Sequence, residues 1–447
     1  MALLANAPLT GPKGGYFFGC AGAFRRDQLG FYESCARQYG DVVQTRLGPF
    51  RVLLLYHPDP IEEIFVTRNR DFVKSPGLQL LRPLLGDGLF LSEGDTWLRQ
   101  RRLLQPAFHR QRVAGYGDVM TTLAARHIAG WKDGDVVEVH AEMMALTQAI
   151  VGKTLFGADV SGAAHEVAQA ARVLAEDFAA RLRSLRLIPY WAPTPQNIRS
   201  RRAIRRIDTL IDRIIAERRA SGEDRGDLLS MLLHAQDADD GSRMIGRQVR
   251  DEAMTMFMAG HETTAVALSW SWYLLAQNLS TDARLADELR EVLAGRPPSV
   301  ADLPRLRYTG MVVSEAMRLY PPAYAIARQA ARPTEIGGHA IAAGDILIAP
   351  AWVIHRDRRW FEDPEAFRPE RWADGLAQRL PRFAYFPFGG GPRQCIGNSF
   401  AQMEAVLLLA TIAQSFRLSL VPGHPVVPLA RLTLRPEFGM KMVLSRR

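Results

Sequence analysis

Cysteine is scarce in this chain of 447 residues, which contains Cys20, Cys35 and Cys395 and no other cysteine. Three cysteines provide no disulfide framework, so the sequence favours a reducing compartment over export, and we expect a cytoplasmic protein. Residues 1–20 contain neither an apolar run long enough to span a bilayer nor a signal-peptide pattern. The sequence therefore predicts no membrane anchor.

Linkers and internal repeats are also missing. The length alone is compatible with about two or three domains, but no Gly-, Ser- or Pro-rich segment separates them, so a single domain over residues 1–447 is predicted. Hydrophobic residues make up 47% of the chain, which is enough for a large core. The net charge is +9, but the arginines are dispersed and no nucleic-acid-binding motif occurs, which argues against nucleic acid as a partner.

Helical periodicity covers most of the sequence, and strand patterns cover a smaller part. Residues 42–47 and 51–55 are strand-like runs on either side of Gly48-Pro49, which predicts a hairpin. We expect a mainly α fold with a smaller β-rich portion near the N-terminal side. Further local expectations are a Leu-rich loop at 78–91, helices at 163–187 and 199–219 separated by Pro189, Pro193 and Pro195, and a final hairpin at 432–444 that turns near Pro436 and Gly439.

Cys395 lies in a glycine-rich loop, Phe386-Pro-Phe-Gly-Gly-Gly-Pro-Arg-Gln-Cys-Ile-Gly397. A predicted helix from Asn398 to Ile412 follows, so Cys395 lies at a helix N-terminus, where the dipole favours a thiolate. A buried, inert cysteine would not need so many glycines nearby, because glycine is costly unless the backbone requires it. The loop therefore indicates a functional cysteine.

Four interpretations of this loop compete. A buried free cysteine is the usual fate of a single Cys, and a nucleophilic cysteine needs a nearby base, although the loop contains no His. A phosphate-binding loop is excluded because Lys-Ser or Lys-Thr does not follow the glycines. The favoured interpretation is a thiolate that ligates a flat cofactor. Phe388 would then pack beside the sulfur, Gly397 would let a ring approach the backbone, and Arg393 would reach an acidic group on the cofactor.

A second unusual stretch lies inside a predicted helix of about thirty residues, from Gly246 to Gln277. Its centre reads Ala259-Gly-His-Glu-Thr-Thr264, a poor choice for the middle of a buried helix, and such a broken rule often marks a functional site. A zinc-binding His-Glu-x-x-His motif is excluded, because Ala265 occupies the position of the second His. Ala259 and Gly260 leave space beside the helix, and the Thr263 hydroxyl can bond to the Ala259 carbonyl.

The cysteine loop resembles the haem-binding loop of the cytochrome P-450 monooxygenases. It matches the pattern Phe-x-x-Gly-x-Arg-x-Cys-x-Gly at every fixed place, and the resemblance extends over nearly the whole chain. The fixed places are Phe388, Gly391, Arg393, Cys395 and Gly397. Further family motifs occur in the right order, as Trp97-x-x-x-Arg101, Ala259 to Thr264, Glu315-x-x-Arg318 and Phe367 to Arg371.

The resemblance implies a role for each matching residue. Cys395 would be the axial ligand of the iron in haem b. Trp97, Arg101, Arg328 and Arg393 would donate hydrogen bonds to the haem propionates. Ala259 and Gly260 would leave room for O2, and Thr263 and Glu262 would manage the protons that oxygen cleavage requires. Glu315, Arg318 and Arg371 would form a structural ion-pair cluster behind the cysteine loop.

The implied reaction inserts one atom of O2 into a C–H or C=C bond of an apolar substrate, such as a fatty-acid-, terpenoid- or steroid-like molecule. No dinucleotide fingerprint occurs, and the chain after Cys395 is too short for a fused reductase. Electrons from NAD(P)H would therefore arrive through a ferredoxin or flavodoxin with its reductase, in a salt-sensitive complex with a monomeric enzyme. Two alternatives stay open, namely a haem-thiolate isomerase or dehydratase that uses no O2, and a haem-based sensor or carrier.

Overall fold

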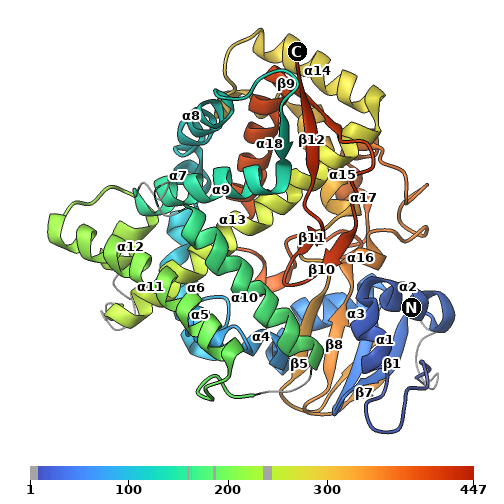
Figure 1. Cartoon of the computed structure of the whole chain (residues 1–447). Helices are drawn as coiled ribbons and strands as arrows, with labels where there is room; N and C mark the ends of the chain where they lie inside the picture. Colours follow the sequence, from blue (N-terminus) through green and yellow to red (C-terminus); the bar gives the residue numbers. More distant parts are fainter. Residues whose placement is uncertain (1–8, 159–161, 163, 185–187, 235–243) are drawn as a thin grey trace. The chain divides into compact units, whose positions relative to one another are not determined.

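The computed structural model describes residues 9–158, 162, 164–184, 188–234 and 244–447, and helices dominate it (Figure 1). The strands among these residues form four small sheets. The expected mainly α fold with a smaller β-rich portion is therefore confirmed.

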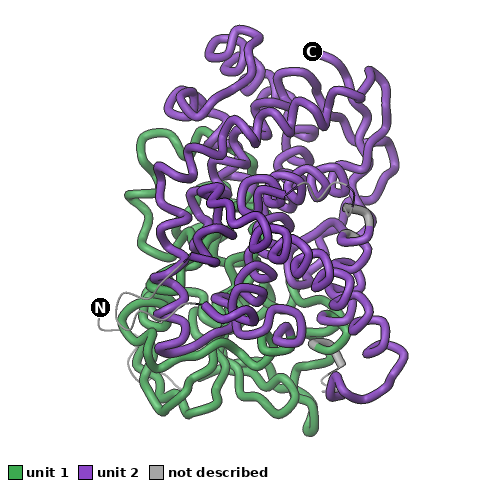
Figure 2. The backbone as a smooth tube through the Cα atoms, turned by 90° about the vertical axis from the view of Figure 1, so that its left-hand side faces the viewer, with its two compact units in different colours: residues 1–80, 179–187, 317–395 green, residues 81–178, 188–316, 396–447 purple. Residues whose placement is uncertain are grey.

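The chain divides into two compact units, which Figure 2 shows in green and purple. Unit 1 contains residues 1–80, 179–187 and 317–395, and unit 2 contains residues 81–178, 188–316 and 396–447. Neither unit is a continuous stretch, because the chain passes from one to the other at 80/81, 178/179, 187/188, 316/317 and 395/396. This division does not test the expected single domain, which stays a prediction.

Unit 1 is built on a five-stranded sheet with the order β1-β2-β8-β5-β3. Strands β1 and β2 form the predicted hairpin, in which Leu47 pairs with Phe50 across a turn where Gly48 has a φ of +60°. The strands of this unit are β1 (Val42–Leu47), β2 (Phe50–Leu55), β3 (Phe72–Lys74), β5 (Ile326–Ala330), β6 (Thr334–Ile336), β7 (His339–Ile341) and β8 (Ile346–Ala349). Its helices are α1 (Ala21–Arg26), α2 (Gln28–Tyr39), α3 (Pro58–Glu62), η1 (Glu63–Thr67), η2 (Asn69–Asp71), α4 (Pro76–Gln79), α16 (Ala351–Ile354), η6 (Pro369–Gly375), α17 (Leu376–Arg379) and η7 (Gly391–Arg393).

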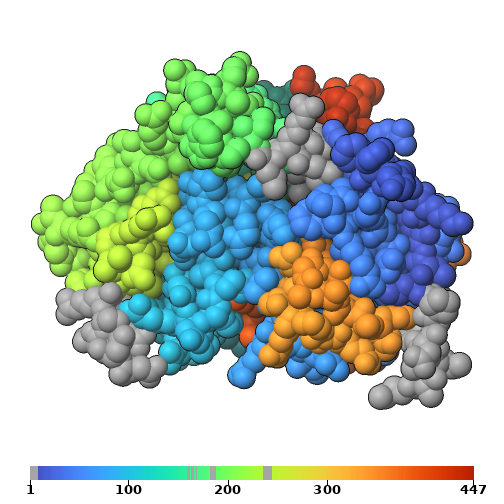
Figure 3. Space-filling model, turned by 90° about the horizontal axis from the view of Figure 1, so that it is seen from below, coloured from blue at the N-terminus to red at the C-terminus, as the bar shows by residue number. Residues whose placement is uncertain are grey.

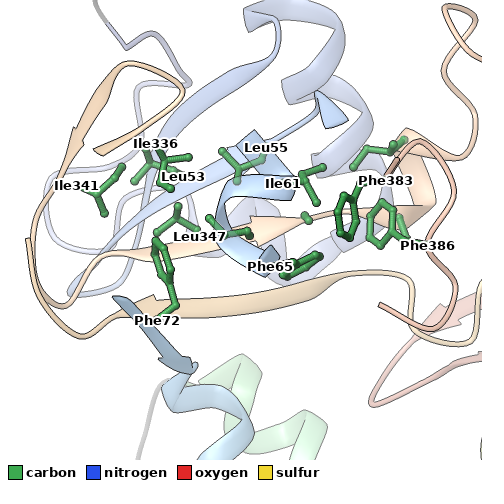
Figure 4. Close-up of a cluster of buried hydrophobic side chains, with 14 of the residues drawn as sticks. Leu53, Leu55, Ile61, Phe65, Phe72, Ile336, Ile341, Leu347, Phe383 and Phe386 are labelled. Atoms are coloured by element: carbon green, nitrogen blue, oxygen red, sulfur yellow. The ribbon is translucent and has the colours of Figure 1, made fainter. Parts of the chain in front are cut away.

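The expectation that the β-rich portion lies near the N-terminal side is only partly right. Strand β8, from the last third of the chain, pairs in parallel with β2, and β5 pairs with both β8 and β3. The β6–β7 hairpin is also tied to N-terminal elements, because Gly337 N–H donates to Glu63 (3.1 Å) and Thr334 donates to Asp71 (2.8 Å). Figure 3 shows this orange hairpin beside the blue N-terminal segments. The core of the unit therefore joins residues that are far apart in sequence, as Figure 4 shows for Leu53, Phe72 and Leu347.

Unit 2 is predominantly helical, and its longest helix is α13 (Gly246–Gln277), whose bounds agree with the sequence-based prediction. Its other helices are α5 (Arg82–Leu85), α6 (Gly94–Leu104), η3 (Gln105–Phe108), α7 (Arg110–Ala114), α8 (Gly117–Ile128), α9 (Val139–Phe156), α11 (Pro195–Ser221), α12 (Leu228–His234), α14 (Leu279–Leu293), η5 (Val300–Asp302) and α18 (Asn398–Ser415). Helices α10 (Ala164–Ser184) and α15 (Arg307–Leu319) contribute residues to both units. The strands of unit 2 are β4 (Val136–Glu138), β9 (Phe416–Leu420), β10 (Pro428–Ala430), β11 (Leu434–Pro436) and β12 (Lys441–Arg446).

Three local predictions need correction. The expected final hairpin is wrong, because β11 pairs with β10, whereas β12 pairs with β9 and β4. The Leu-rich stretch 78–91 is not all loop, since it contains the end of α4 and the whole of α5. Pro195 does not separate two helices but occupies the first turn of α11, where its missing N–H costs nothing. The end of the helix expected at 163–187 lies partly outside the described residues.

Over the part of the chain that the structure describes, no helix combines the length and the apolar character that crossing a bilayer requires.

Candidate active site

The loop that carries Cys395 belongs to unit 1 and is closed by backbone hydrogen bonds. The N–H of Cys395 donates to the Phe388 carbonyl at 3.0 Å, and the N–H of Gly389 donates to the Phe386 carbonyl at 2.9 Å. The cysteine itself is exposed. It lies two residues before Gly397, which is the N-cap of α18, so its predicted place just ahead of a helix is confirmed.

Glycine is required in this loop for two reasons. Gly389 and Gly391 have φ angles of +69° and +67°, a backbone region that L side chains rarely adopt. At Gly391 a Cβ atom would also lie 1.8 Å from the carbonyl oxygen of Phe65 in η1. The loop therefore approaches the backbone of η1 so closely that no side chain fits between them.

Aromatic rings pack against the cysteine loop, and one histidine accepts a hydrogen bond from its backbone. The ring centroid of Phe65 lies 5.5 Å from that of Phe383 and 6.2 Å from that of Phe386, and Figure 4 shows the three rings together. The N–H of Phe386 donates to Nε2 of the buried His355 at 3.0 Å. Burial and the nearby Arg318 and Arg356 lower the pKa of His355 to about 3, so the ring stays a neutral acceptor. The expected structural role of His355 agrees with this geometry.

Arg328 lies close to the cysteine loop within unit 1. Its guanidinium carbon is 5.3 Å from the centroid of the Phe65 ring, which also contacts the loop, and the residue is buried. Ile326 is two residues earlier on β5 and therefore on the same face, and its Cδ1 would lie 3.3 Å from a Cβ at Gly389. Arg393 is half-buried in η7. The structure thus brings Arg328 and the loop residues Phe388, Arg393 and Cys395 into one region.

Two arginines behind the loop bind backbone carbonyls. The fully buried Arg318 donates to the carbonyls of His355 (2.9 Å), Pro364 (2.6 Å) and Ala366 (3.1 Å). Arg371 donates to the Ala366 carbonyl as well, at 3.3 Å. The two guanidinium groups therefore meet at one carbonyl oxygen, which fixes the chain segment ahead of the cysteine loop. Their third expected partner, Glu315, is fully buried on α15.

The centre of α13 belongs to unit 2 and combines exposed and buried residues on adjacent positions. Ala259 is exposed and Thr263 is half-buried, whereas His261 and Glu262 are buried. Ala259 and Thr263 are four residues apart and share a face. The Thr263 hydroxyl donates to the Ala259 carbonyl at 3.0 Å, as predicted, while α13 continues as an uninterrupted α-helix. Ala259 and Gly260 therefore provide a stretch of helix with almost no side chain beside a hydroxyl group.

Helix α9 packs against α13 at the same level. The buried Thr147 hydroxyl donates to the His261 carbonyl at 3.0 Å, and a Cβ at Gly260 would lie 3.0 Å from Val151. The side chain of His261 bonds to the Phe257 carbonyl through Nδ1 at 2.6 Å. These contacts hold α13 against α9. Gly260 therefore also serves the close packing of these two helices.

Glu262 is held by partners that the sequence did not reveal. Its Oε1 accepts hydrogen bonds from the Thr433 hydroxyl (2.6 Å) and from Arg435 Nη2 (2.5 Å) on the C-terminal strand segment. Burial alone would raise the pKa of Glu262, but attraction to Arg435 and these hydrogen bonds outweigh it and hold that pKa below its ordinary value. Glu262 is therefore a carboxylate. No local signal could have found the pair, because about 170 residues separate its members.

Trp97 and Arg101 lie four residues apart on α6, are both half-buried and share one helical face, as predicted. The Nε of Arg101 donates to Gln105 at 3.1 Å, which orients the guanidinium. Both side chains carry N–H donors of the kind that a carboxylate needs.

The Leu-rich stretch is fixed to the first half of α13 by two acids that sequence reasoning missed. The N–H groups of Asp87 and Leu89 donate to Asp251 and Glu252, both at 3.0 Å. Gly88 permits this approach, since a Cβ there would lie 2.3 Å from the Thr255 hydroxyl. Burial raises the pKa of Glu252 to about 8, against the effect of the Leu89 hydrogen bond. The backbone of this segment is thereby anchored, and Leu84, Leu85 and Leu89 are buried.

The predicted site residues fall into both units. Cys395, Phe388, Arg393 and Arg328 belong to unit 1, and Trp97, Arg101, Ala259, Gly260, Glu262, Thr263 and Gly397 belong to unit 2. The donor set fits a haem group: an exposed sulfur next to glycines that allow close approach, guanidinium and indole donors for carboxylates, and a helix stretch without bulky side chains. A second kind of metal site is not indicated, because no cluster of three or more His, Cys, Asp or Glu ligands occurs within the described ranges.

Comparison with known proteins identifies the family. The family model described as "Cytochrome P450" matches residues 9–442. The chain is 40% identical to cyclooctatin synthase of Streptomyces melanosporofaciens, with 89% of this chain and 87% of the relative covered. It is 37% identical to cyclooctat-9-en-7-ol 5-monooxygenase of the same organism, with 86% and 84% covered. It is 32% identical to pentalenene oxygenase of Streptomyces avermitilis, with 98% and 97% covered.

Members of this family use haem b, react with O2 and an organic substrate, and receive electrons from redox partners. The family match covers nearly the whole chain, and the three relatives are matched over most of their own length. Both findings agree with the family that the cysteine loop resembles. The chain belongs to the cytochrome P-450 family and is a haem-dependent monooxygenase.

Proposed function

We propose that this enzyme inserts one atom of O2 into a C–H or C=C bond of a terpenoid. Two relatives are named for the oxygenation of cyclooctat-9-en-7-ol and of pentalenene, both of which are terpenoids. A terpenoid is therefore favoured over the fatty-acid- and steroid-like molecules that the sequence left open.

The observation that carries this proposal is the pairing of Ala259 with Thr263 on α13. A hydroxyl bonded to the carbonyl four residues earlier is held beside a part of the helix that is exposed and almost free of side chains. An enzyme that activates O2 needs such a proton-carrying group beside open space. An isomerase or dehydratase that uses no O2 has no need for this arrangement, and neither has a sensor or carrier.

Haem, when bound through Cys395, supplies the iron at which O2 is reduced, and the thiolate favours cleavage of the O–O bond. Cys395 would hold the cofactor, and two backbone hydrogen bonds close the loop that presents it. Arg328 and Arg393 of unit 1, and Trp97 and Arg101 of unit 2, carry the N–H donors that would hold the propionates. The cationic side chains also neutralise the charge of these carboxylates.

Thr263 holds the proton closest to the exposed stretch of α13, on Oγ1. That hydroxyl donates to the Ala259 carbonyl, and rotation about its C–O bond would let it donate a proton into the space beside this stretch instead. Glu262 acts less directly. Both of its hydrogen bonds use Oε1, which leaves Oε2 as the oxygen able to take up a proton from water. We infer that protons pass through Glu262 by way of this second oxygen while Arg435 holds the first.

Electrons come from NAD(P)H through a separate ferredoxin or flavodoxin with its reductase. The net charge of +9 supports an acidic carrier. We propose that the carrier docks on the Cys395 side of a monomeric enzyme in the cytoplasm. Raising the ionic strength should weaken the complex, because charged surfaces guide such encounters. An affinity that does not change with salt would contradict this part of the proposal.

The proposed function is tested in two steps. A panel of cyclic terpenes, fatty acids and steroids is first screened for ligands that change the spin state of the haem spectrum, and terpenes are expected to give the strongest response. The best ligand is then incubated with NAD(P)H, a surrogate redox pair and oxygen-18 gas. Incorporation of one labelled oxygen atom per product molecule confirms a monooxygenase. Turnover without electron donor would instead indicate an isomerase or dehydratase, and ligand binding without any turnover would indicate a sensor.

A further inference from the structure

An aromatic turn projects from the N-terminal part of unit 1, and the proposed function makes no use of it. Tyr16, Phe17 and Phe18 are consecutive, and their exposed fractions are 87%, 78% and 68%. Large aromatic side chains are normally half-buried or better, so three exposed ones in a row mark an interaction surface. In Figure 1 the darkest blue chain, ahead of α1, forms a loop beside β1.

The aromatic turn, defined as residues Gly15–Gly19, is fixed and not a loose tail. Gly15 and Gly19 exchange two backbone hydrogen bonds of 3.0 and 2.9 Å, which closes the turn. Gly19 also bridges to Leu47 at the end of β1, and Gly19 has a φ of +57°. Arg46 Nη2 donates to the Gly15 carbonyl at 3.0 Å and to the Tyr16 carbonyl. The aromatic side chains therefore stay exposed because the sheet holds their backbone outward.

Cationic side chains accompany the aromatic turn. Lys13, Arg25, Arg26 and Arg46 are all exposed. The sequence contains no Asp or Glu before Asp27. Within the described residues Lys13, Arg25 and Arg26 form no ion pair, so their charge is available to an anionic partner. The segment from Lys13 to Asp27 thus combines three exposed aromatic side chains with an excess of positive charge, since Asp27 is its only acidic residue.

We propose that the aromatic turn, together with Lys13, Arg25 and Arg26, docks the enzyme on the surface of an anionic lipid bilayer. Aromatic side chains prefer the interface of a bilayer, where their rings sit at headgroup level, and Lys and Arg near the surface are attracted by anionic headgroups. A protein partner fits less well, because a specific protein interface buries about 800 Å² on each side and a tip of three side chains offers much less. This contact is peripheral and needs no spanning helix.

The docking is tested with the purified full-length protein and lipid vesicles. Vesicles of phosphatidylcholine alone and vesicles that also contain phosphatidylglycerol are sedimented with the protein, and the bound fraction is measured. We expect binding to the phosphatidylglycerol vesicles that weakens as salt is raised. A variant with Tyr16→Ser, Phe17→Ser and Phe18→Ser should bind about tenfold or more weakly. The double variant Arg25→Gln and Arg26→Gln should lose the preference for anionic over neutral vesicles.

A matched control comes from another exposed aromatic residue. Phe438 is 55% exposed but follows the acidic Glu437, so Phe438→Ser should leave vesicle binding unchanged. Because the three aromatic side chains contribute little to the core, all variants should unfold at the same temperature as the wild-type protein. Wild-type protein that fails to bind phosphatidylglycerol vesicles, or a triple serine variant that binds them equally well, would overturn the proposal.

A second measurement shows whether the tip enters the lipid. The variant Phe17→Trp places a fluorophore at the middle of the aromatic turn. Relative to wild-type protein, its additional fluorescence should shift to shorter wavelength with phosphatidylglycerol vesicles and be quenched by brominated lipid. Additional fluorescence that stays unchanged would indicate that the tip remains in water and would also contradict the proposal. Neither measurement depends on catalysis, so its outcome is separate from that of the proposed function.

Discussion

The cysteine loop of unit 1 and the centre of α13 in unit 2 both break a local rule of protein structure, but in different ways. The loop departs from regular backbone geometry, since Gly389 and Gly391 have positive φ and Gly391 touches the backbone of η1. The centre of α13 keeps regular helical geometry, and its unusual feature is the choice of side chains. Ala259 and Gly260 occupy positions where a long helix with a buried face normally has bulky residues. One site is shaped by the backbone and the other by missing side chains.

This difference has consequences for mutation. In the cysteine loop, one added methyl group collides with backbone, which cannot move aside cheaply. In the centre of α13, the polar side chains make hydrogen bonds that the helix itself does not need. We therefore expect substitutions of the loop glycines to damage folding and cofactor binding, and substitution of Thr263 in the helix to damage the reaction while the fold survives. The following predictions test this contrast, from the largest expected effect to the smallest.

Cys395→Ser should abolish the absorption band of sulfur-bound haem in the reduced protein under carbon monoxide, together with all product formation. Serine has nearly the same size but cannot supply the soft thiolate that the iron requires. The control is Cys20→Ala, which removes a buried cysteine elsewhere in unit 1 and should retain the band. If Cys395→Ser kept the band, the assignment of the iron ligand would be wrong.

Gly391→Ala should destabilise the protein by about 2–5 kcal/mol and lower haem content. The estimate combines the cost of a positive φ, about 1–2 kcal/mol, with the cost of overpacking, about 1–3 kcal/mol. Gly344→Ala is the matched control, since Gly344 has a φ of +92° with nothing within 4 Å of its Cβ position. Denaturant unfolding that gives equal losses for both variants would show that close approach to Phe65 is unimportant.

Arg435→Met should destabilise the protein by about 3 kcal/mol at about pH 7, because it leaves the buried Glu262 carboxylate without its cation. The folded-state pKa of Glu262 is lowered, so the pair stabilises the protein above the ordinary pKa of a glutamate. That contribution is lost as pH falls through the lowered pKa of the folded state. The difference between wild type and variant should therefore shrink toward acidic pH.

Unfolding free energies measured from neutral to acidic pH check this prediction. Arg435→Lys keeps the charge and should restore most of the stability, whereas Thr433→Val removes an uncharged donor to the Glu262 carboxylate and should cost about 1.5 kcal/mol. A gap between wild type and Arg435→Met that is independent of pH would exclude Glu262 as its cause.

Thr263→Ala should lower the product formed per NAD(P)H consumed about tenfold, which corresponds to about 1.4 kcal/mol, and should leave the unfolding free energy nearly unchanged. The hydroxyl bonds to a carbonyl that the helix already satisfies, so its loss affects proton delivery and not folding. Thr263→Ser should recover the coupling. Thr264→Ala, at a buried neighbouring position, is the control. An equal loss of coupling in both alanine variants would contradict a specific role for Thr263.

Much of the fold was predictable because its signals are local. The bounds of α13 follow from an apolar run without proline, and the β1–β2 hairpin follows from two strand-like runs around Gly48. The cysteine loop is similarly readable, since Cys395, Arg393 and Phe388 stand within a few residues of one another. Their roles remain predictions, although the family to which they point is confirmed.

The errors concern partners that are distant in sequence. A strand pattern shows that 434–436 and 441–446 are extended, but it does not show which edge each strand will meet, so the expected final hairpin was wrong. The position of Glu262 was readable as part of a motif, whereas its fixation by Arg435 and Thr433 was not.

The sequence by itself determined the helices, the glycine-rich loop and the place of the cysteine, because backbone preferences and periodicity depend on neighbouring residues. The tertiary structure alone decided that Arg328 joins the cysteine loop through Phe65, that β8 enters the N-terminal sheet and that Glu262 is paired. A buried charge needs a partner and a strand edge needs another strand, but both can be supplied by a distant part of the chain. Which part supplies them depends on how the whole core packs.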